Sequence, residues 1–380
     1  MNNTINRRAW FKSALAITGG LTLSSTFTNQ LLAAPVSHAE GNFIPLLNEK
    51  LVRLGSNENP YGPSPLARKA LAEATAEFNR YTFELVQEFK KVLADKEGVS
   101  PDHILVVNGS SETLCLTGMA LALEGGAVLS AFPTFRSLMD YAEKLHARWD
   151  RVDVDDYHKH DLDALAAAVK PDTRLMFLCN PNNPTGTVIE GKKYLDFCQE
   201  MSKKTLVFSD EAYLEFLEPD EQQSAVELVR KGHNVMVSRT FSKVYGLAGL
   251  RLGYAIAQPD VIKKISKYQM GPVINQAGLA AAKASLNDVA FAKLTRSKNN
   301  EALNFFQQYL DKKGWFHGQS RTNCVLFPAP KDGKTILAET MKRGFQIRVW
   351  DFQGKEWCRV SIGTLNEMKA FVKAFDEVVG

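Results

Sequence analysis

The chain has 380 residues, of which 45% are hydrophobic and 23% are charged, an ordinary composition for a globular protein. This length is enough for two domains, and the net charge of +4 gives no support for a nucleic-acid partner. No internal run is long and apolar enough to span a bilayer. The cysteines form no CxxC pair, which argues against a disulfide framework or a metal site and predicts buried free thiols at Cys115, Cys179, Cys198, Cys324 and Cys358.

The N-terminal segment has the pattern of a twin-arginine export signal. The pair Arg7-Arg8 is followed by aromatic residues, a lysine and a mildly apolar run from Ser13 to about Ser25. Ser37-His38-Ala39 suits a cleavage site, so we expect residues 1–39 to be a leader that engages the twin-arginine export machinery and is removed. The mature protein is then periplasmic or secreted. The alternative is an amphipathic or disordered tail on a protein that stays in the cytoplasm.

A turn-rich loop from Leu54 to Pro63 leads to a helix that starts at Ser64-Pro65. A second helix is predicted from Glu84 to Lys96, with one apolar face formed by Leu85, Phe89, Val92 and Leu93. The run 104–107 predicts a buried strand, after which Asn108-Gly109-Ser110-Ser111-Glu112 turns into another helix. A helix start with two serines can bind an anion, although a plain serine N-cap explains the same residues.

Further short apolar runs alternate with helical stretches, and polar side chains follow their carboxyl ends. Phe135 follows the run 128–130, where it can stack on a flat ring or simply join the core. Asn183 belongs to the rigid loop 180–186 after the strand 175–179. Asp210 and Tyr213 follow the run 206–208, where a carboxylate can address a ring nitrogen or cap a helix. This pattern predicts a mostly parallel, doubly wound sheet with its site at the carboxyl edge.

The most informative stretch follows the apolar run 235–237 and contains Lys243 among small hydroxyl residues. A lysine in this setting can form a Schiff base with an aldehyde cofactor. Thr240, Ser242 and Arg251 are suited to bind a phosphate beside it. A basic, glycine-rich surface loop is the alternative for this stretch alone.

After Ala277 a helical pattern continues to about Gly314, and a smaller α+β unit follows. Its predicted parts are strands at 323–327, 346–350 and 358–362, a helix near 335–343, and a final helix with an apolar face. The predicted organisation is therefore a leader (1–39), an N-terminal arm (40–64), a large domain (65–285) and a small C-terminal domain (286–380).

Four motifs occur together in one order: Asn-Glu-Asn-Pro-Tyr-Gly (57–62), Asn-Pro-Asn-Asn-Pro-Thr-Gly (180–186), Asp-Glu-Ala-Tyr (210–213) and the lysine segment 242–253. With them the chain, from Leu51 to its C-terminus, resembles the fold-type I, pyridoxal-phosphate-dependent aminotransferases of class I/II. Within that family it looks most similar to the histidinol-phosphate aminotransferases.

The resemblance implies a function for each motif. Lys243 would bind pyridoxal 5'-phosphate covalently and move the substrate proton, and Asp210 would pair with the pyridine nitrogen. Asn183 and Tyr213 would address the ring oxygen, and Phe135 would stack on the ring. The phosphate would be held by Ser110, Ser111, Thr240, Ser242 and Arg251. Tyr81 would reach the cofactor of a partner subunit, which implies a homodimer with shared active sites.

The implied reaction moves an amino group between an amino acid or histidinol phosphate and a 2-oxo acid such as 2-oxoglutarate. Arg359 would bind the carboxylate or phosphate of the substrate, with Tyr61 and Arg348 as further substrate-side candidates. Two departures stand out: Phe135 replaces a frequent Tyr, and Tyr81-Thr82-Phe83 replaces the usual Tyr-Pro-Asp. A lyase on the same scaffold (a decarboxylase or C–S lyase) and a non-catalytic exported sensor are the alternative functions.

Overall fold

The computed structural model describes residues 51–380, apart from 272–273 and 353, and these residues fall within one compact unit. The predicted leader and the first part of the predicted arm, residues 40–50, lie outside the described residues. None of the helices within the described ranges is long and apolar enough to cross a bilayer. The residue boundaries expected for the two domains stay predictions.

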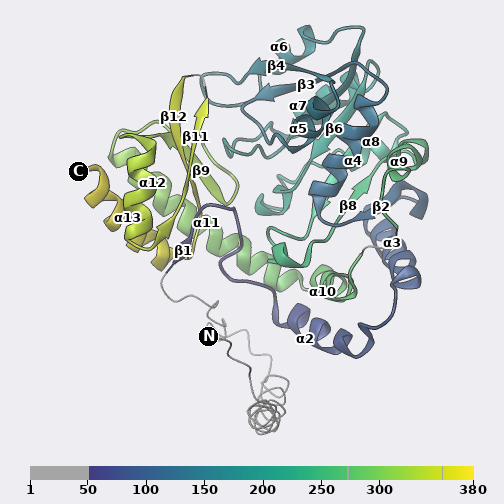
Figure 1. The fold of residues 1–380 in the computed structure, drawn as a ribbon, viewed down its shortest axis with the longest axis horizontal. Coiled ribbons are helices and arrows are strands. Elements are labelled where there is room, and N and C mark those ends of the chain that lie inside the picture. The colour runs from purple at the N-terminus through teal and green to yellow at the C-terminus, as the bar shows by residue number, and fades with distance from the viewer. Residues whose placement is uncertain (1–50, 272–273, 353) are drawn as a thin grey trace, which may run out of the picture. The chain divides into compact units, whose positions relative to one another are not determined.

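The described strands form a large sheet, a small sheet and a two-stranded ribbon (Figure 1). In the large sheet seven described strands run in the order β2-β8-β7-β6-β5-β3-β4. Only the pairs of β8 with β7 and β2 are antiparallel among these strands; the others are parallel. The predicted mostly parallel sheet is therefore confirmed. The strands are β2 (Ile104–Val107), β3 (Ala127–Phe132), β4 (Arg148–Asp153), β5 (Thr173–Cys179), β6 (Leu206–Asp210), β7 (Val235–Thr240) and β8 (Gly253–Ile256).

Successive residues of each strand point to opposite sides of the sheet, so both faces of this sheet carry apolar side chains. Helices cover both faces. On β6, Val207 joins the apolar cluster on one face and Phe208 the cluster on the other. By the same alternation, Asp210 lies on the face of Phe208, and Glu211 lies on the face of Val207. The helices of this part are α2 (Pro65–Ala74), α3 (Phe83–Glu97), α4 (Ser110–Ala122), α5 (Ser137–Lys144), α6 (Leu162–Ala167), α7 (Gly191–Met201), α8 (Val226–Arg230), α9 (Pro259–Ser266) and α10 (Gln276–Asn287).

The C-terminal part is a smaller α+β unit, as predicted (Figure 1). Its three described sheet strands are antiparallel in the order β11-β12-β9, namely β11 (Arg348–Phe352), β12 (Lys355–Ser361) and β9 (Cys324–Pro328). Its helices are α11 (Val289–Lys312), α12 (Gly333–Lys342) and α13 (Leu365–Val379). In its core Phe306 packs edge to face against Phe327 and Phe371, and Phe327 does so against Phe375.

The segment after residue 50 joins this C-terminal unit. Strand β1 (Val52–Arg53) pairs in parallel with β10 (Phe345–Gln346), and the Ser361 amide donates to the Leu54 carbonyl at 2.8 Å. The chain then continues through Asn57 and Asn59, which are buried. The N-terminal loop is therefore fixed against β12 before the first helix begins.

Two local expectations differ from the structure. The second predicted helix spans Phe83–Glu97, but Leu85 is 36% exposed and does not join the buried face with Phe89 and Leu93. Strand β4 was not expected, because four of its six residues are charged. Trp149 is the residue of β4 that is buried, so one face of this edge strand carries the packing. All five cysteines are free, as predicted, and four are buried; Cys115 was also expected to be buried but is only partly so.

Candidate active site

A pocket of about 290 Å³ lies at the carboxyl ends of the parallel strands. Its wall combines residues from the large sheet, the N-terminal loop and the small sheet. Every predicted site residue except Tyr61 and Tyr81 lines it. The lining residues are Ser56, Asn57, Glu58, Ser110, Ser111, Phe135, Asn183, Asp210, Ala212, Tyr213, Thr240, Ser242, Lys243, Ala248, Arg251, Arg348 and Arg359.

One end of the pocket is suited to a phosphate. Helix α4 begins there, after Gly109 with φ 75°, and no side chain caps it. The Arg251 guanidinium lies so close that a Cβ on Gly109 would come within 2.6 Å of its Nη2. Thr240 Oγ1 and Ser242 Oγ lie 3.0 Å apart on the same wall. A helix N-terminus, hydroxyl groups and a guanidinium together form a strong anion site.

Lys243 is partly buried in the middle of the pocket wall. Its Nζ donates to the Asn57 carbonyl at 3.1 Å and lies 5.4 Å from the centre of the Tyr213 ring. Burial and the positive charge of Arg359 lower the pKa of Lys243 to about 8. A substantial fraction of this amine is therefore neutral, and so nucleophilic, near neutral pH.

Asp210 is the buried carboxylate of the pocket, only 2% exposed. It accepts a hydrogen bond from the Ala212 amide at 3.2 Å. Burial raises the pKa of Asp210 to about 7, against the opposing effects of that amide and of Lys243. A positively charged group in the pocket would favour the ionised carboxylate.

A hydrogen-bonded chain crosses the pocket from the large sheet to the small one. Asn183 Nδ2 donates to the Tyr213 hydroxyl at 3.2 Å, and Arg359 Nη1 donates to Asn183 Oδ1 at 3.0 Å. Burial raises the pKa of Tyr213, so its hydroxyl stays protonated. Among the described residues, the buried Nε of Arg359 has no hydrogen-bond partner. The positive charge of Arg359 on the pocket wall is suited to bind an anion.

Asn57 is the main pocket residue that sequence reasoning did not assign. Its Nδ2 donates to the Tyr213 hydroxyl at 3.0 Å, and its Oδ1 accepts from Ser361 Oγ at 2.7 Å. Its backbone has φ 52°, a conformation that asparagine adopts more readily than most residues. The polar motif 57–62 was the available signal, but it did not indicate which side chain enters the pocket.

The two remaining predicted residues lie elsewhere. Tyr81 is 77% exposed and lines a surface groove with Phe78 and Ile274. Tyr61 lines a small separate pocket beside Phe216 and Thr295. Neither side chain contributes to the main pocket within one chain.

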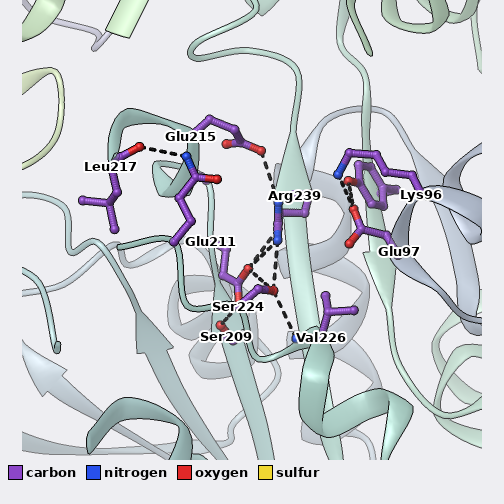
Figure 2. A network of polar contacts seen from close by, with 12 residues as sticks. Lys96, Glu97, Ser209, Glu211, Glu215, Leu217, Ser224, Val226 and Arg239 are labelled. Atoms are coloured by element: carbon purple, nitrogen blue, oxygen red, sulfur yellow. Dashed lines mark hydrogen bonds and ion pairs between the residues drawn. The ribbon is translucent and has the colours of Figure 1, made fainter. Parts of the chain in front are cut away.

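A second feature that the sequence did not predict lies behind the pocket. Arg239 and Glu211, both buried, form an ion pair with a nitrogen–oxygen distance of 2.8 Å (Figure 2). Their neighbours in the chain, Thr240 and Asp210, face the pocket.

Comparison with known proteins identifies the family. The aminotransferase class I and II family matches residues 49–375. A histidinol-phosphate aminotransferase from Moorella thermoacetica is 34% identical over 332 residues, covering 87% of this chain and 86% of the relative. A histidinol-phosphate aminotransferase 1 from Cupriavidus pinatubonensis is 37% identical over 333 residues, with 87% and 88% covered.

A solved structure gives the same result for the fold. The histidinol-phosphate aminotransferase from Sinorhizobium meliloti, solved in complex with pyridoxal-5'-phosphate, aligns with a TM-score of 0.79 at 28% identity. The alignment covers 87% of this chain and 90% of that one.

The pocket of this chain fits the same cofactor. The space beside Gly109 faces Arg251 and offers an anion site, while a nucleophilic lysine and a buried carboxylate lie on the same wall. These groups match the phosphate, the aldehyde and the ring nitrogen of pyridoxal phosphate. The chain belongs to the class I and II aminotransferase family and is a pyridoxal-phosphate-dependent transaminase.

Proposed function

We propose that this transaminase takes the amino group from histidinol phosphate, or from an amino acid with a second anionic group, and transfers it to a 2-oxo acid such as 2-oxoglutarate. The observation that carries the proposal is the pair of arginines, Arg348 and Arg359, on the wall of the pocket that also holds Lys243. The relatives named histidinol-phosphate aminotransferase, at 34% and 37% identity, support this substrate.

Each residue of the pocket has a proposed task. Lys243 would bind the cofactor covalently, Asp210 would pair with its ring nitrogen, and Phe135 would pack on its ring. Asn183 and Tyr213 would hydrogen-bond the ring oxygen. The phosphate would be held by Ser110, Ser111, Thr240, Ser242 and Arg251. When bound, pyridoxal phosphate supplies an electron-withdrawing ring that stabilises negative charge at the substrate Cα.

The chain's own residues then bind the substrate and move one proton. Arg359 lines the pocket and offers its guanidinium to the carboxylate or phosphate of the substrate. Its guanidinium lies 5.3 Å from the centre of the Trp350 ring, which limits the directions it can take. The ε-amino group of Lys243, neutral in part because of burial, would accept the proton from the substrate Cα and deliver it to C4′ of the cofactor, acting first as a base and then as an acid.

An absorbance titration tests the proposed donor. The cofactor-loaded protein lacking residues 1–39 is mixed with histidinol phosphate, and separately with aromatic, acidic and aliphatic amino acids, without any 2-oxo acid. We expect histidinol phosphate to convert the bound cofactor to its pyridoxamine form, and Arg359→Gln to weaken this conversion. If no amine converts the cofactor, and ammonia, carbon dioxide or sulfide is released, the lyase alternative is supported instead.

We propose that the protein works as a homodimer in which Tyr81 reaches the partner's pocket. Phe78, Tyr81 and Phe83 are 51%, 77% and 55% exposed on one short stretch of chain, and such a cluster of exposed aromatic side chains is typical of an interface.

Mixing two inactive variants tests this arrangement. In a hybrid dimer of Tyr81→Ala and Lys243→Ala chains, one site carries both changes and the other carries neither. We therefore expect up to about a quarter of wild-type activity to return on mixing, from statistical subunit exchange. A monomer in sedimentation, or a mixture without recovered activity, would contradict the proposal.

We also propose export through the twin-arginine pathway. The family match begins at residue 49, so the predicted leader is additional to the aminotransferase part. Cell fractionation of the full-length protein and of the Arg7→Lys/Arg8→Lys variant provides the test. Equal cytoplasmic retention of both proteins would count against export.

A further inference from the structure

We propose that the buried Glu211–Arg239 ion pair is a positioning element for the cofactor, which fixes the ends of β6 and β7 from behind and balances the charge next to Asp210. The proposal rests on the role proposed above for Asp210. The two residues touch neither the pocket nor its contents, so they act through their chain neighbours Asp210 and Thr240.

Two nitrogens of the Arg239 guanidinium contact the Glu211 carboxylate. Arg239 Nε and Nη2 both approach Glu211 Oε2, at 2.9 and 2.8 Å. Their side chains are 6% and 0% exposed, so water screens the pair very little. Within the sheet, Asp210 is in register with Ser238, and the Glu211 amide donates to the Ser238 carbonyl at 3.0 Å. The ion pair therefore joins the two strands where they enter the pocket.

The other contacts of Glu211 leave its carboxylate no freedom to move. Its oxygens accept from the Ala225 amide at 2.7 Å, from Ser224 Oγ at 2.8 Å and from Ser209 Oγ at 3.0 Å. Figure 2 shows Ser209, Ser224 and Arg239 beside Glu211. Such a fully satisfied buried network holds one conformation of the surrounding backbone.

Arg239 also interacts with carboxylates on other elements. Its Nη1 donates to Glu215 on η3 (Leu214–Phe216) at 3.2 Å. The charge of Glu97, at the end of α3, acts on it as well, and Tyr254 of β8 donates to Glu97 at 2.7 Å. Loss of the arginine would leave the buried Glu211 and the partly buried Glu215 without the cation they share, which is strongly unfavourable.

The charges around Asp210 make the role testable. Lys243 faces it from the loop after β7, Cys179 from β5, and Glu211 follows it in the chain. The Glu211 charge raises the pKa of Asp210, and Lys243 lowers it, although burial has the largest effect. Removing Arg239 leaves the negative charge of Glu211 unpaired next to Asp210. Replacing Glu211 by glutamine removes that negative charge.

The experiment measures the dissociation constant of pyridoxal phosphate against pH, by absorbance and tryptophan fluorescence, without any substrate. The variants are Arg239→Gln, Glu211→Gln and Asp210→Asn, and circular dichroism of each cofactor-free protein checks its fold. We expect affinity to fall in acid as Asp210 takes up a proton. The midpoint, which is the pH at which half of this loss of affinity has occurred, should move up by about half a pH unit or more in Arg239→Gln. It should move down by a similar amount in Glu211→Gln. At neutral pH, Arg239→Gln should bind the cofactor about tenfold more weakly.

Midpoints that stay at the wild-type pH, or that move in the same direction in both variants, would overturn the proposal, because a purely structural role predicts no opposite shifts. Glu215→Gln is the matched control: it removes another partner of Arg239 that is not next to Asp210, so its midpoint should not move. If Arg239→Gln does not fold, Arg239→Lys keeps the charge and should keep the midpoint while weakening affinity. If the affinity of Asp210→Asn still falls in acid, the proposed role of Asp210 itself is wrong. This outcome is distinct from a failure of the proposal for the ion pair.

Discussion

Replacing Arg359 by glutamine is expected to slow the uptake of pyridoxal phosphate by the cofactor-free protein, through the pKa of Lys243. The Lys243 pKa is lowered to about 8 by burial first and by the charge of Arg359 second. Only the neutral amine attacks an aldehyde, so uptake should accelerate as the pH rises through about 8 and level off above it. Without the Arg359 charge, the pKa should rise by about one unit.

The size of the effect follows from the ionisation equilibrium. Near pH 7.5 a pKa of about 8 leaves about a quarter of the Lys243 amines neutral, and an increase of one unit leaves about 3%. Uptake by Arg359→Gln should therefore be about eightfold slower at that pH, with little difference above about pH 10. Stopped-flow absorbance of the bound cofactor, recorded across this pH range, gives the rates.

Arg348→Gln is the matched control. Arg348 lines the same pocket but is exposed to solvent, where water and salt weaken its effect on Lys243. An unchanged rate in Arg359→Gln, or an equal slowing in both variants, would refute the reasoning.

Three further predictions concern the cofactor-free protein and its free energy of unfolding. Burial raises the pKa of Asp210 to about 7, so the folded state binds this proton more tightly than the unfolded chain, and stability falls as the pH rises from about 4 to 7. Between pH 5 and 8 this contribution amounts to about 3 kcal/mol, and Asp210→Asn should abolish it in urea unfolding at these two pH values; an unchanged pH dependence would contradict it. Gly246→Ala should destabilise the protein by more than about 1 kcal/mol in urea, because Gly246 has φ 70° and a Cβ would lie 2.2 Å from the Gly62 carbonyl oxygen; wild-type stability would contradict it. Asn57→Ala should cost about 2–3 kcal/mol, since it loses three side-chain hydrogen bonds and strains a backbone with φ 52°, whereas Asn57→Gly should cost less; equal losses would show that the backbone conformation contributes nothing.

Much of the site was predictable because its residues follow apolar strands directly. The run Leu206–Phe208 places Asp210 at a strand end, and the strand before Lys243 does the same for the lysine. Parallel strands bring such ends to one sheet edge, so chain order was enough to expect them together.

The parts that were missed depend on contacts between distant segments. Strand β8 was hidden within a glycine-rich stretch, and it pairs antiparallel with β7 and β2 only after the chain has turned back at Arg251. A buried Arg239 could not be inferred from its own surroundings in the sequence, because its partners Glu211, Glu215 and Glu97 come from three other elements. Asn57 enters the pocket because β12 holds its loop, a contact that spans 304 positions.

That last contact has a consequence for the order in which the protein is made. The Asn57 amide donates to Ser361 Oγ at 2.8 Å, so one wall of the pocket closes only when residues from both ends of the chain meet. During synthesis the large sheet can assemble before β12 leaves the ribosome, but the loop that carries Asn57 cannot make its contacts with Ser361 until then. Closing so long a loop is slow compared with local folding. The nascent chain therefore acquires its lysine and its anion site before the wall that Asn57 and Ser361 form together.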